Sequence, residues 1–172
     1  MTVSIGDVIC EVMLQAYKSL EAICTDIEEQ SRRVALCSIN KTVYKSVERL
    51  AELNKEITAY SNVRYIIEQA LSKAGGTKEL RRYYIQGETL AAIALSDGLE
   101  QQAIRDKIVR QRRRLFKEIK RAYRYDELLN IIVDSKMLMG MYAKGHKRAV
   151  EAKTLKDRYK PEKRNKTGRE GK

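Results

Sequence analysis

The organisation of the chain is decided by one stretch, Leu80 to Leu115, which reads LRRYYIQGETLAAIALSDGLEQQAIRDKIVRQRRRL. Its apolar residues fall on single helical faces, and Gly87 and Gly98 interrupt the pattern. Thr89 stands where its hydroxyl can cap a new helix. The stretch therefore predicts a short lead helix, a second helix from about Thr89 and a long basic helix over about Glu100 to Tyr123.

Two helices joined by a tight turn meet the first requirement of a helix-turn-helix. In that motif the second helix enters the major groove while the first rests across the DNA backbone. The motif needs a small residue where the helices approach, a glycine at the turn and apolar residues on the inner face of the second helix. These positions are filled here by Ile93, Ala94, Gly98, Leu99, Ile104 and Ile108. The alternative is an ordinary helical hairpin with no role in DNA binding.

The same stretch resembles region 4 of the sigma-70 family and the related helix-turn-helix regulators of phages and mobile elements. The resemblance rests on the aromatic helix that ends at Gly87, the Leu90–Ala94 segment, the Gly98-Leu99 turn and the arginines that follow, and it covers about a fifth of the chain. Asp97 departs from the family, in which the residue before the turn glycine is usually apolar. The resemblance implies a sequence-specific DNA-binding transcription regulator.

The predicted basic helix carries two sets of candidate contacts. Gln and Arg can each form a bidentate pair with one base edge, adenine and guanine respectively, and Asp can accept a hydrogen bond from cytosine. The base-reading candidates, at the N-terminal end of the helix, are Gln101, Gln102, Arg105 and Asp106. Phosphate contacts position a protein on the duplex without reading its sequence. The candidates for them are Arg81, Arg82, Lys107, Arg110, Arg112, Arg113 and Arg114.

Charge is segregated along the chain, whose formal net charge is +12. Residues 1–76 contain nine Lys or Arg against ten Asp or Glu, residues 77–125 thirteen against six, and residues 144–172 twelve against four. A neutral half joined to a basic block and a basic tail is typical of a protein with a polyanionic partner, because neutralised phosphates release condensed counterions. DNA is the predicted partner, and RNA is the weaker alternative because arginine-rich helices also bind it.

Residues 1–74 predict a helical hairpin. Apolar residues at steps of three and four indicate one helix over Ile5–Val34 and another over Val43–Leu71, which Ser38 or Asn40 can cap. The near-heptad steps of the second helix allow a coiled-coil contact with another copy, and packing within the chain is the alternative. We expect this half to form a homo-oligomer or to contact RNA polymerase.

Two adjacent glycines, Gly75 and Gly76, end the hairpin, since glycine supplies the left-handed residue of a helix C-cap. Beyond them, periodic apolar residues from Leu128 to Met141 indicate one supporting helix. After Gly145 apolar residues become scarce and Lys and Arg accumulate. The predicted all-α fold thus has three parts: a hairpin at 1–74, a helix-turn-helix domain at 77–143 and a basic flexible tail at 144–172.

The sequence offers no catalytic, cofactor or metal site. It lacks a phosphate-cradling GxxxxGK[ST] loop, an HExxH motif and a nucleophile elbow, and its single histidine, His146, stands in the basic tail. Its three cysteines include no CxxC pair. The N-terminal apolar run is broken by Asp7 and Glu11, which argues against a signal peptide or membrane span. We expect a cytoplasmic protein that is not an enzyme and has no membrane partner.

Two other functions compete with sequence-specific regulation. One is a structural DNA-binding assembly protein, such as a small phage packaging subunit or a nucleoid component, whose basic segments hold DNA without reading it. The other is a divergent alternative sigma factor. The latter is disfavoured because the N-terminal half is neutral and lacks the aromatic, basic character of a promoter-melting region.

Overall fold

The computed structural model describes residues 5–37 and 43–158, and every regular element in these two ranges is an α-helix. In chain order the helices are α1 (Ile5–Lys18), α2 (Leu20–Cys37), α3 (Val43–Lys73), α4 (Lys78–Tyr84), α5 (Leu90–Asp97), α6 (Gln101–Ala122), α7 (Tyr125–Val133) and α8 (Lys136–Arg158). The described residues contain no β-strand, which confirms the predicted all-α class. None of these helices is long and apolar enough to cross a membrane.

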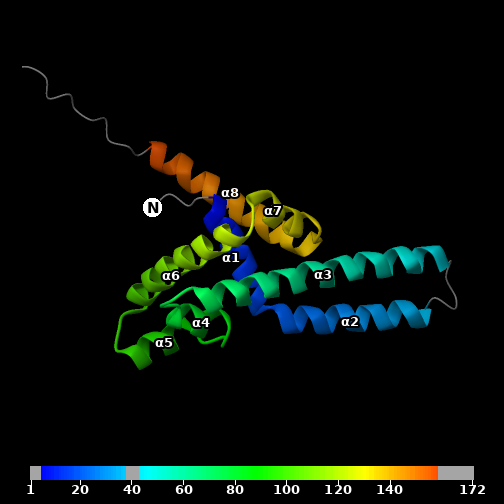
Figure 1. The fold of residues 1–172 in the computed structure, drawn as a ribbon, viewed down its shortest axis with the longest axis horizontal. Coiled ribbons are helices and arrows are strands. Elements are labelled where there is room, and N and C mark those ends of the chain that lie inside the picture. The colour runs from blue at the N-terminus through cyan, green and yellow to red at the C-terminus, as the bar shows by residue number, and fades with distance from the viewer. Residues whose placement is uncertain (1–4, 38–42, 159–172) are drawn as a thin grey trace, which may run out of the picture.

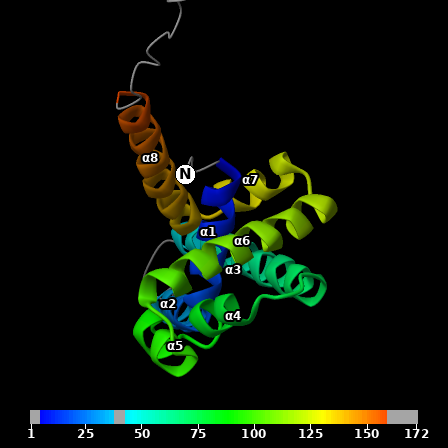
Figure 2. The same cartoon turned by 90° about the vertical axis from the view of Figure 1, so that its left-hand side faces the viewer.

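The helices form a body and a long arm (Figure 1). Helices α2 and α3 pack side by side as the arm, which projects from one end of the body. Helices α4 to α8 gather at the other end, and α1 lies among them in contact with α3, α4, α6 and α8. Viewed from the end opposite the arm, α5 and α6 lie on the near side of the body (Figure 2).

Helix α1 is the centre of the hydrophobic core because nearly every face of it is apolar. A helix that is hydrophobic all round is stable only when it is surrounded. Of residues 6–18, only Gln15 and Lys18 are exposed. A single core therefore joins α1 to the helices that follow Gly75 and Gly76, and it is continuous across the predicted domain boundary.

Two glycines let neighbouring helices approach α1 closely. A Cβ on Gly6 of α1 would overlap the ring of Phe116 on α6. A Cβ on Gly145 of α8 would lie 2.9 Å from Cγ1 of Val8 on α1. Since real Cβ atoms do not make such short contacts, these two positions favour glycine for reasons of space.

The single helix predicted over Ile5–Val34 is wrong, because the chain bends at Ser19 between α1 and α2. The Ser19 hydroxyl donates to the carbonyl oxygen of Gln15 at 3.1 Å. The Ser19 N–H forms a bifurcated hydrogen bond to the carbonyl oxygens of Gln15 and Ala16. Side-chain bonding of this kind competes with the helical ladder and bends helices. The bend sends α1 into the core and leaves α2 to pair with α3.

The single supporting helix predicted over Leu128–Met141 is likewise divided, into α7 and α8. Ser135 breaks it: its Oγ accepts from the N–H of Leu138 at 3.0 Å, as an N-cap does. Glu56 of α3 accepts from the Ser135 hydroxyl and from the N–H of Lys136, the latter at 2.7 Å. A carboxylate at this position also complements the positive end of α8.

The expectation of a flexible tail from Lys144 is corrected by α8, which continues to Arg158. The segment 147–158 reads KRAVEAKTLKDR and is rich in good helix formers, although it is poor in apolar residues. The part of α8 that precedes this segment approaches α1 closely at Gly145. Residues 159–172, and the predicted caps Ser38 and Asn40, lie outside the described residues.

The apolar stripe predicted on the second helix of the hairpin serves mainly packing within the chain. Its members Leu53, Tyr60, Ile67 and Leu71 are at most 4% exposed in α3. Val47, from the same stripe, is 58% exposed. The coiled-coil contact with another copy therefore cannot use this whole stripe.

Candidate nucleic-acid interface

Helices α5 and α6 are joined by a turn of three residues, 98–100, whose geometry follows from local chemistry. The hydroxyl of Thr89 accepts from the N–H of Ala92 at 3.1 Å and caps the start of α5. Gly98 ends α5 with φ 63° and ψ 33°, a left-handed conformation that costs glycine little. The N–H of Leu99 reaches back to the carbonyl of Ala94 at 3.0 Å, which completes a Schellman cap.

The inner faces of α5 and α6 pack together through the residues expected there, with one exception. Four of the motif residues are at most 5% exposed, namely Ile93, Ala94, Ile104 and Ile108. Leu99, expected on the inner face, is 40% exposed. Leu99 belongs to the turn and to neither helix, so helical spacing does not determine the direction of its side chain.

Helix α4 is attached to the middle of α6 by Gln111, which is buried on the inner face of α6. Its Oε1 accepts from the N–H of Leu80 at 2.8 Å, and its Nε2 donates to the carboxylate of Glu79. Lys107 lies 3.2 Å from the same carboxylate. Burial raises the pKa of Glu79, but the hydrogen bonds from Gln111, the backbone and Lys107 outweigh it and hold this pKa below its usual value.

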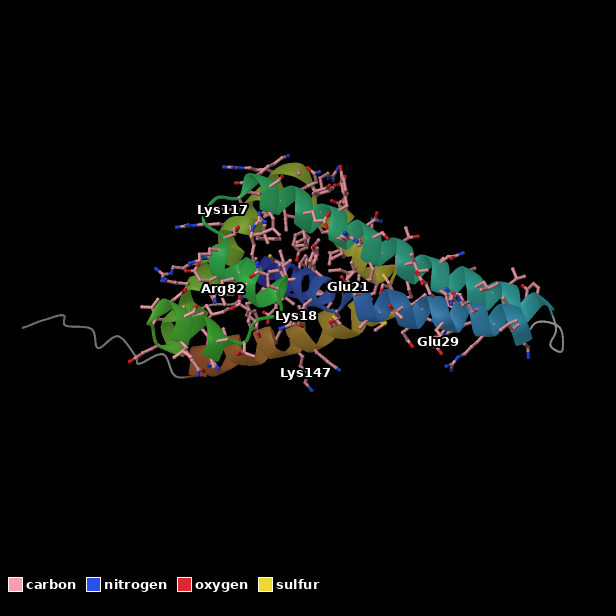
Figure 3. The ribbon with its side chains drawn as sticks, turned by 90° about the horizontal axis from the view of Figure 1, so that it is seen from below. Lys18, Glu21, Glu29, Arg82, Lys117 and Lys147 are labelled. Carbon is pink, nitrogen blue, oxygen red and sulfur yellow. The ribbon has the colours of Figure 1, made fainter. Side chains whose placement is uncertain are left out.

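Helix α4 is attached to α5 by Arg82 (labelled in Figure 3). Its guanidinium lies 2.6 Å from Glu88 and 3.0 Å from Asp97, and it also donates to the hydroxyl of Ser96 at 2.8 Å. The side chains of Arg82 and Asp97 are 16% and 14% exposed. The hydrogen bond to Glu88 raises the pKa of Arg82. This pairing explains Asp97, whose carboxylate joins α5 to α4 where the resembled family has an apolar residue.

The four base-reading candidates are brought together at the free N-terminal end of α6. Gln101, Gln102, Arg105 and Asp106 are all exposed. The Nε2 of Gln102 donates to the carboxylate of Asp106 at 3.3 Å. Arg105 has no ion pair or hydrogen bond to any side chain in the described part of the chain. Polar groups that can both donate and accept are thus presented to solvent over the first two turns of the helix.

The phosphate candidates fall into two groups, and four of them are engaged within the protein. Arg81 donates to the carbonyl of Leu71 at 2.8 Å, at the end of α3. Arg112 is 13% exposed and lies 2.8 Å from the carboxylate of Glu11 on α1. Lys107 and Arg82 are paired as described above. These four side chains form contacts between helices of the protein, and their role as phosphate contacts stays a prediction.

The other three phosphate candidates, Arg110, Arg113 and Arg114, form no ion pair with a described carboxylate. Arg110 and Arg114 are exposed and Arg113 is half-buried. The buried stripe of α6 runs along Ile104, Ile108, Gln111, Leu115 and Ile119, so helical spacing places Arg110 and Arg113 on the opposite side.

The same outer side of α6 continues into cations for which the sequence alone favoured a merely solvated face. Lys117, Lys120 and Arg121 are exposed, and Lys117 points away from the body (Figure 3). Of these three, Arg121 pairs with Glu118 at 2.6 Å on the surface. We call the side formed by Arg110, Arg113, Lys117, Lys120 and Arg121 the basic face of α6. Its spacing of three and four residues is visible in the sequence once the buried stripe is known.

No group of side chains in the described ranges is arranged to hold a metal ion. Comparison of the chain with known protein families, with curated protein sequences and with solved structures finds no match.

Proposed function

We propose that the protein binds double-stranded DNA through α5 and α6, and that it acts as a sequence-specific transcription regulator. The observation that carries this proposal is the surface of α6, whose N-terminal end exposes Gln, Arg and Asp side chains and whose remaining turns carry the basic face. Base edges are read by such polar groups, and phosphates are held by such cations.

The length of α6 is sufficient for both roles, base reading at its N-terminal end and phosphate contacts along the rest. A helix of 22 residues is about 33 Å long, and the major groove of B-form DNA admits a helix. Only the first turns of a recognition helix approach the base edges in a helix-turn-helix. The remainder of α6 would then follow the sugar-phosphate backbone, where the basic face neutralises phosphates.

The contacts of α4 support the proposal in a different way. A recognition helix discriminates between bases only if its angle to the neighbouring helices is held. Gln111, Lys107 and Arg82 hold α4 to α6 and α5 from three positions. Contact between the N-terminal helices and RNA polymerase remains a prediction.

One observation favours the second candidate, a structural assembly protein that holds DNA without reading it. The cations of α6 continue as far as Arg121, further than the contacts of a short recognition helix require. Because phosphate contacts are independent of sequence, a protein dominated by them would show little preference among DNA sites.

The experiment that separates the two is a selection of binding sites from random DNA with the full-length protein, followed by affinity measurements at two salt concentrations. We expect an enriched motif, and an affinity for it that exceeds the affinity for random DNA by a thousandfold or so. Lys45→Ala on the arm serves as a control for loss of a remote positive charge. No enriched motif, with equal affinity for all DNA, would favour the assembly protein, and tighter binding to RNA hairpins would overturn DNA as the partner.

A further inference from the structure

Three cations gather around the turn that joins α3 to α4, and none of them belongs to the basic face of α6. Arg114 of α6 is exposed, and its Nη1 lies 3.1 Å from the position that a Cβ on Gly76 would take. Lys73 ends α3 three residues before Gly76, and Lys78 begins α4 two residues after it. Both lysines are exposed. We call Lys73, Lys78 and Arg114 the turn cluster.

The turn cluster continues the basic face of α6 onto two other helices. Residues three and four apart are neighbours on a helix surface, so Arg114 adjoins both Lys117 and Arg110 of the basic face. The turn at Gly76 lies against the guanidinium of Arg114. The cationic surface therefore passes from α6 across this turn to the end of α3 and the start of α4.

Acidic side chains among the described residues do little to neutralise the turn cluster. Lys73 and Arg114 form no ion pair with any carboxylate in the described ranges. Lys78 lies 3.9 Å from Asp97, and the same carboxylate oxygen is 3.0 Å from Arg82. Cations that gather without anions repel one another, so the arrangement is most stable when a polyanion covers it.

The fold has no evident need for these cations. Cations often stand at the end of a helix because its last carbonyls carry partial negative charge. At the end of α3 this role is filled by Arg81, which donates to the carbonyl of Leu71 at 2.8 Å and to the hydroxyl of Thr77 at 3.2 Å. The side chains of Lys73 and Arg114 form no hydrogen bond with a described group, so they are available to a ligand.

The turn cluster is open to a ligand and lies at a suitable distance from the base-reading end of α6. Gly75 and Gly76 are exposed, and a Cβ on Gly75 would meet nothing within 4 Å. Arg114 lies nine residues beyond Arg105, about 14 Å along the helix axis. The major groove is about 8.5 Å deep and 12 Å wide, so a phosphate at its rim lies about 10 Å from a base edge on its floor. Arg114 therefore stands near the rim when Arg105 contacts a base edge.

We propose that the turn cluster binds the sugar-phosphate backbone at the rim of the groove that α6 enters, so that the DNA-binding surface includes the end of α3. This inference rests on the proposed binding of DNA through α6. Duplex DNA carries one negative charge per about 1.7 Å of its axis, so a single stretch of backbone can face all three cations. The surface that it would cover is continuous with the basic face.

The first test measures the DNA affinity of the full-length protein at about 50 and 200 mM salt, with the selected site and with a random duplex. Lys73→Ala and Arg114→Ala should each weaken both complexes. The loss should be about 3.5 times larger at the lower salt, which corresponds to one phosphate contact. Lys45→Ala removes the same charge from the other end of α3 and should show no such dependence. The thermal midpoint verifies that each variant folds.

A charge of opposite sign at the turn provides a second, matched comparison. A Cβ on Gly75, or on Gly140 of α8, meets nothing within 4 Å, so both positions have room for a side chain. Gly75→Glu should weaken binding to all DNA about tenfold at the lower salt. Gly140→Glu makes the same change of charge away from the turn and should leave the affinity within about a factor of two.

Methylphosphonates, which replace single phosphates by neutral groups, show whether the contact is direct. Placed at each position of the selected site in turn, they should weaken binding of the natural protein at specific positions. At one of these positions Arg114→Ala should bind the neutral and the natural backbone equally well, because its contact is already lost.

Unchanged salt dependence of the Lys73→Ala and Arg114→Ala variants, or methylphosphonate effects that Arg114→Ala leaves as they are, would overturn this inference and leave DNA reading by α6 intact. Binding of polyglutamate that these variants abolish, with DNA binding unchanged, would assign the turn cluster to an acidic protein instead. A full-length protein that binds no DNA would overturn both this inference and the proposed function.

Discussion

Arg105 and Arg113 lie about two turns apart on α6, yet they should play different roles in binding DNA. Arg105 stands at the exposed N-terminal end, where base edges are within reach, and Arg113 lies on the basic face. Arg105→Ala should remove about 1–3 kcal/mol of binding free energy at the preferred site. It should also abolish the discrimination among the four bases at one position of that site. Arg113→Ala should weaken all sequences alike and reduce the salt slope by about one phosphate contact.

Fluorescence anisotropy with the selected site and with random DNA, at several salt concentrations, measures both effects. Each variant serves as the control for the other, since both remove one arginine from the same helix. If both lower the affinity for specific and random DNA by the same factor, α6 is a basic helix without base readout.

Gly6 and Gly140 offer a second contrast between single residues, in this case in stability. A Cβ on Gly6 would meet the ring of Phe116, whereas a Cβ on Gly140 meets nothing within 4 Å. Gly6→Ala should therefore lower the free energy of unfolding by about 1–3 kcal/mol through overpacking. Gly140→Ala should raise it by up to about 1 kcal/mol, because alanine favours the helix. Urea denaturation measures both, and equal effects of the two changes would contradict the close approach of α1 and α6.

At the scale of the element, α4 is a brace that holds α5 and α6 at a fixed angle. Arg82 is its link to α5, although the sequence alone places it among the phosphate contacts. Arg82→Ala should lower the thermal midpoint and weaken specific DNA binding, because Asp97 and Glu88 lose their partner and α5 loosens. The slope of log affinity against log salt should stay the same, since no phosphate contact is lost.

Arg110→Ala is the control for that experiment, because Arg110 is exposed and has no carboxylate partner in the described ranges. It should change the slope and leave the thermal midpoint nearly unaltered. A reduced slope for Arg82→Ala would show that Arg82 contacts phosphate after all.

Helices themselves were largely predictable from local signals. Thr89, Gly98 and Gly76 mark helix ends through hydroxyl capping and left-handed backbone, which depend on a few neighbouring residues. The breaks at Ser19 and Ser135 were missed. Serine interrupts a helix only when the neighbouring structure favours it, as Glu56 of α3 does for Ser135.

At the scale of the whole molecule, the core determines how stability depends on pH. Burial raises the pKa of the Cys10 thiol to about 12, and burial likewise raises the pKa values of Tyr60 and Tyr84 to about 12. These groups are neutral in the folded state and ionise at lower pH once the chain unfolds. Their contribution to stability is therefore complete below the unfolded pKa values and is lost as pH rises from about 9 toward 12.

Each unit of pKa difference corresponds to about 1.4 kcal/mol, so the free energy of unfolding should fall by several kcal/mol over this range. Urea midpoints measured from about pH 8 to pH 11 check the decline. Cys10→Ala removes the contribution of the thiol to this pH dependence, so the free energy of unfolding should fall less steeply with pH. A stability that is constant over this range would contradict the burial of these three groups.

The sequence by itself determined the helical class, the ends of α5 and the start of α6, and the segregation of charge, because these depend on composition and on neighbours within about four residues. Only the tertiary structure decided that α1 is the central helix, shared by both halves of the chain. It also decided which cations are available: Arg82 and Arg112 turn inward to Asp97 and Glu11, while Arg110 and Arg113 have no carboxylate partner among the residues that the structure describes. The physical reason is that a cation can bind a ligand only if no neighbouring helix covers it or supplies a carboxylate to it. The number of charges along the sequence does not show which helices are neighbours.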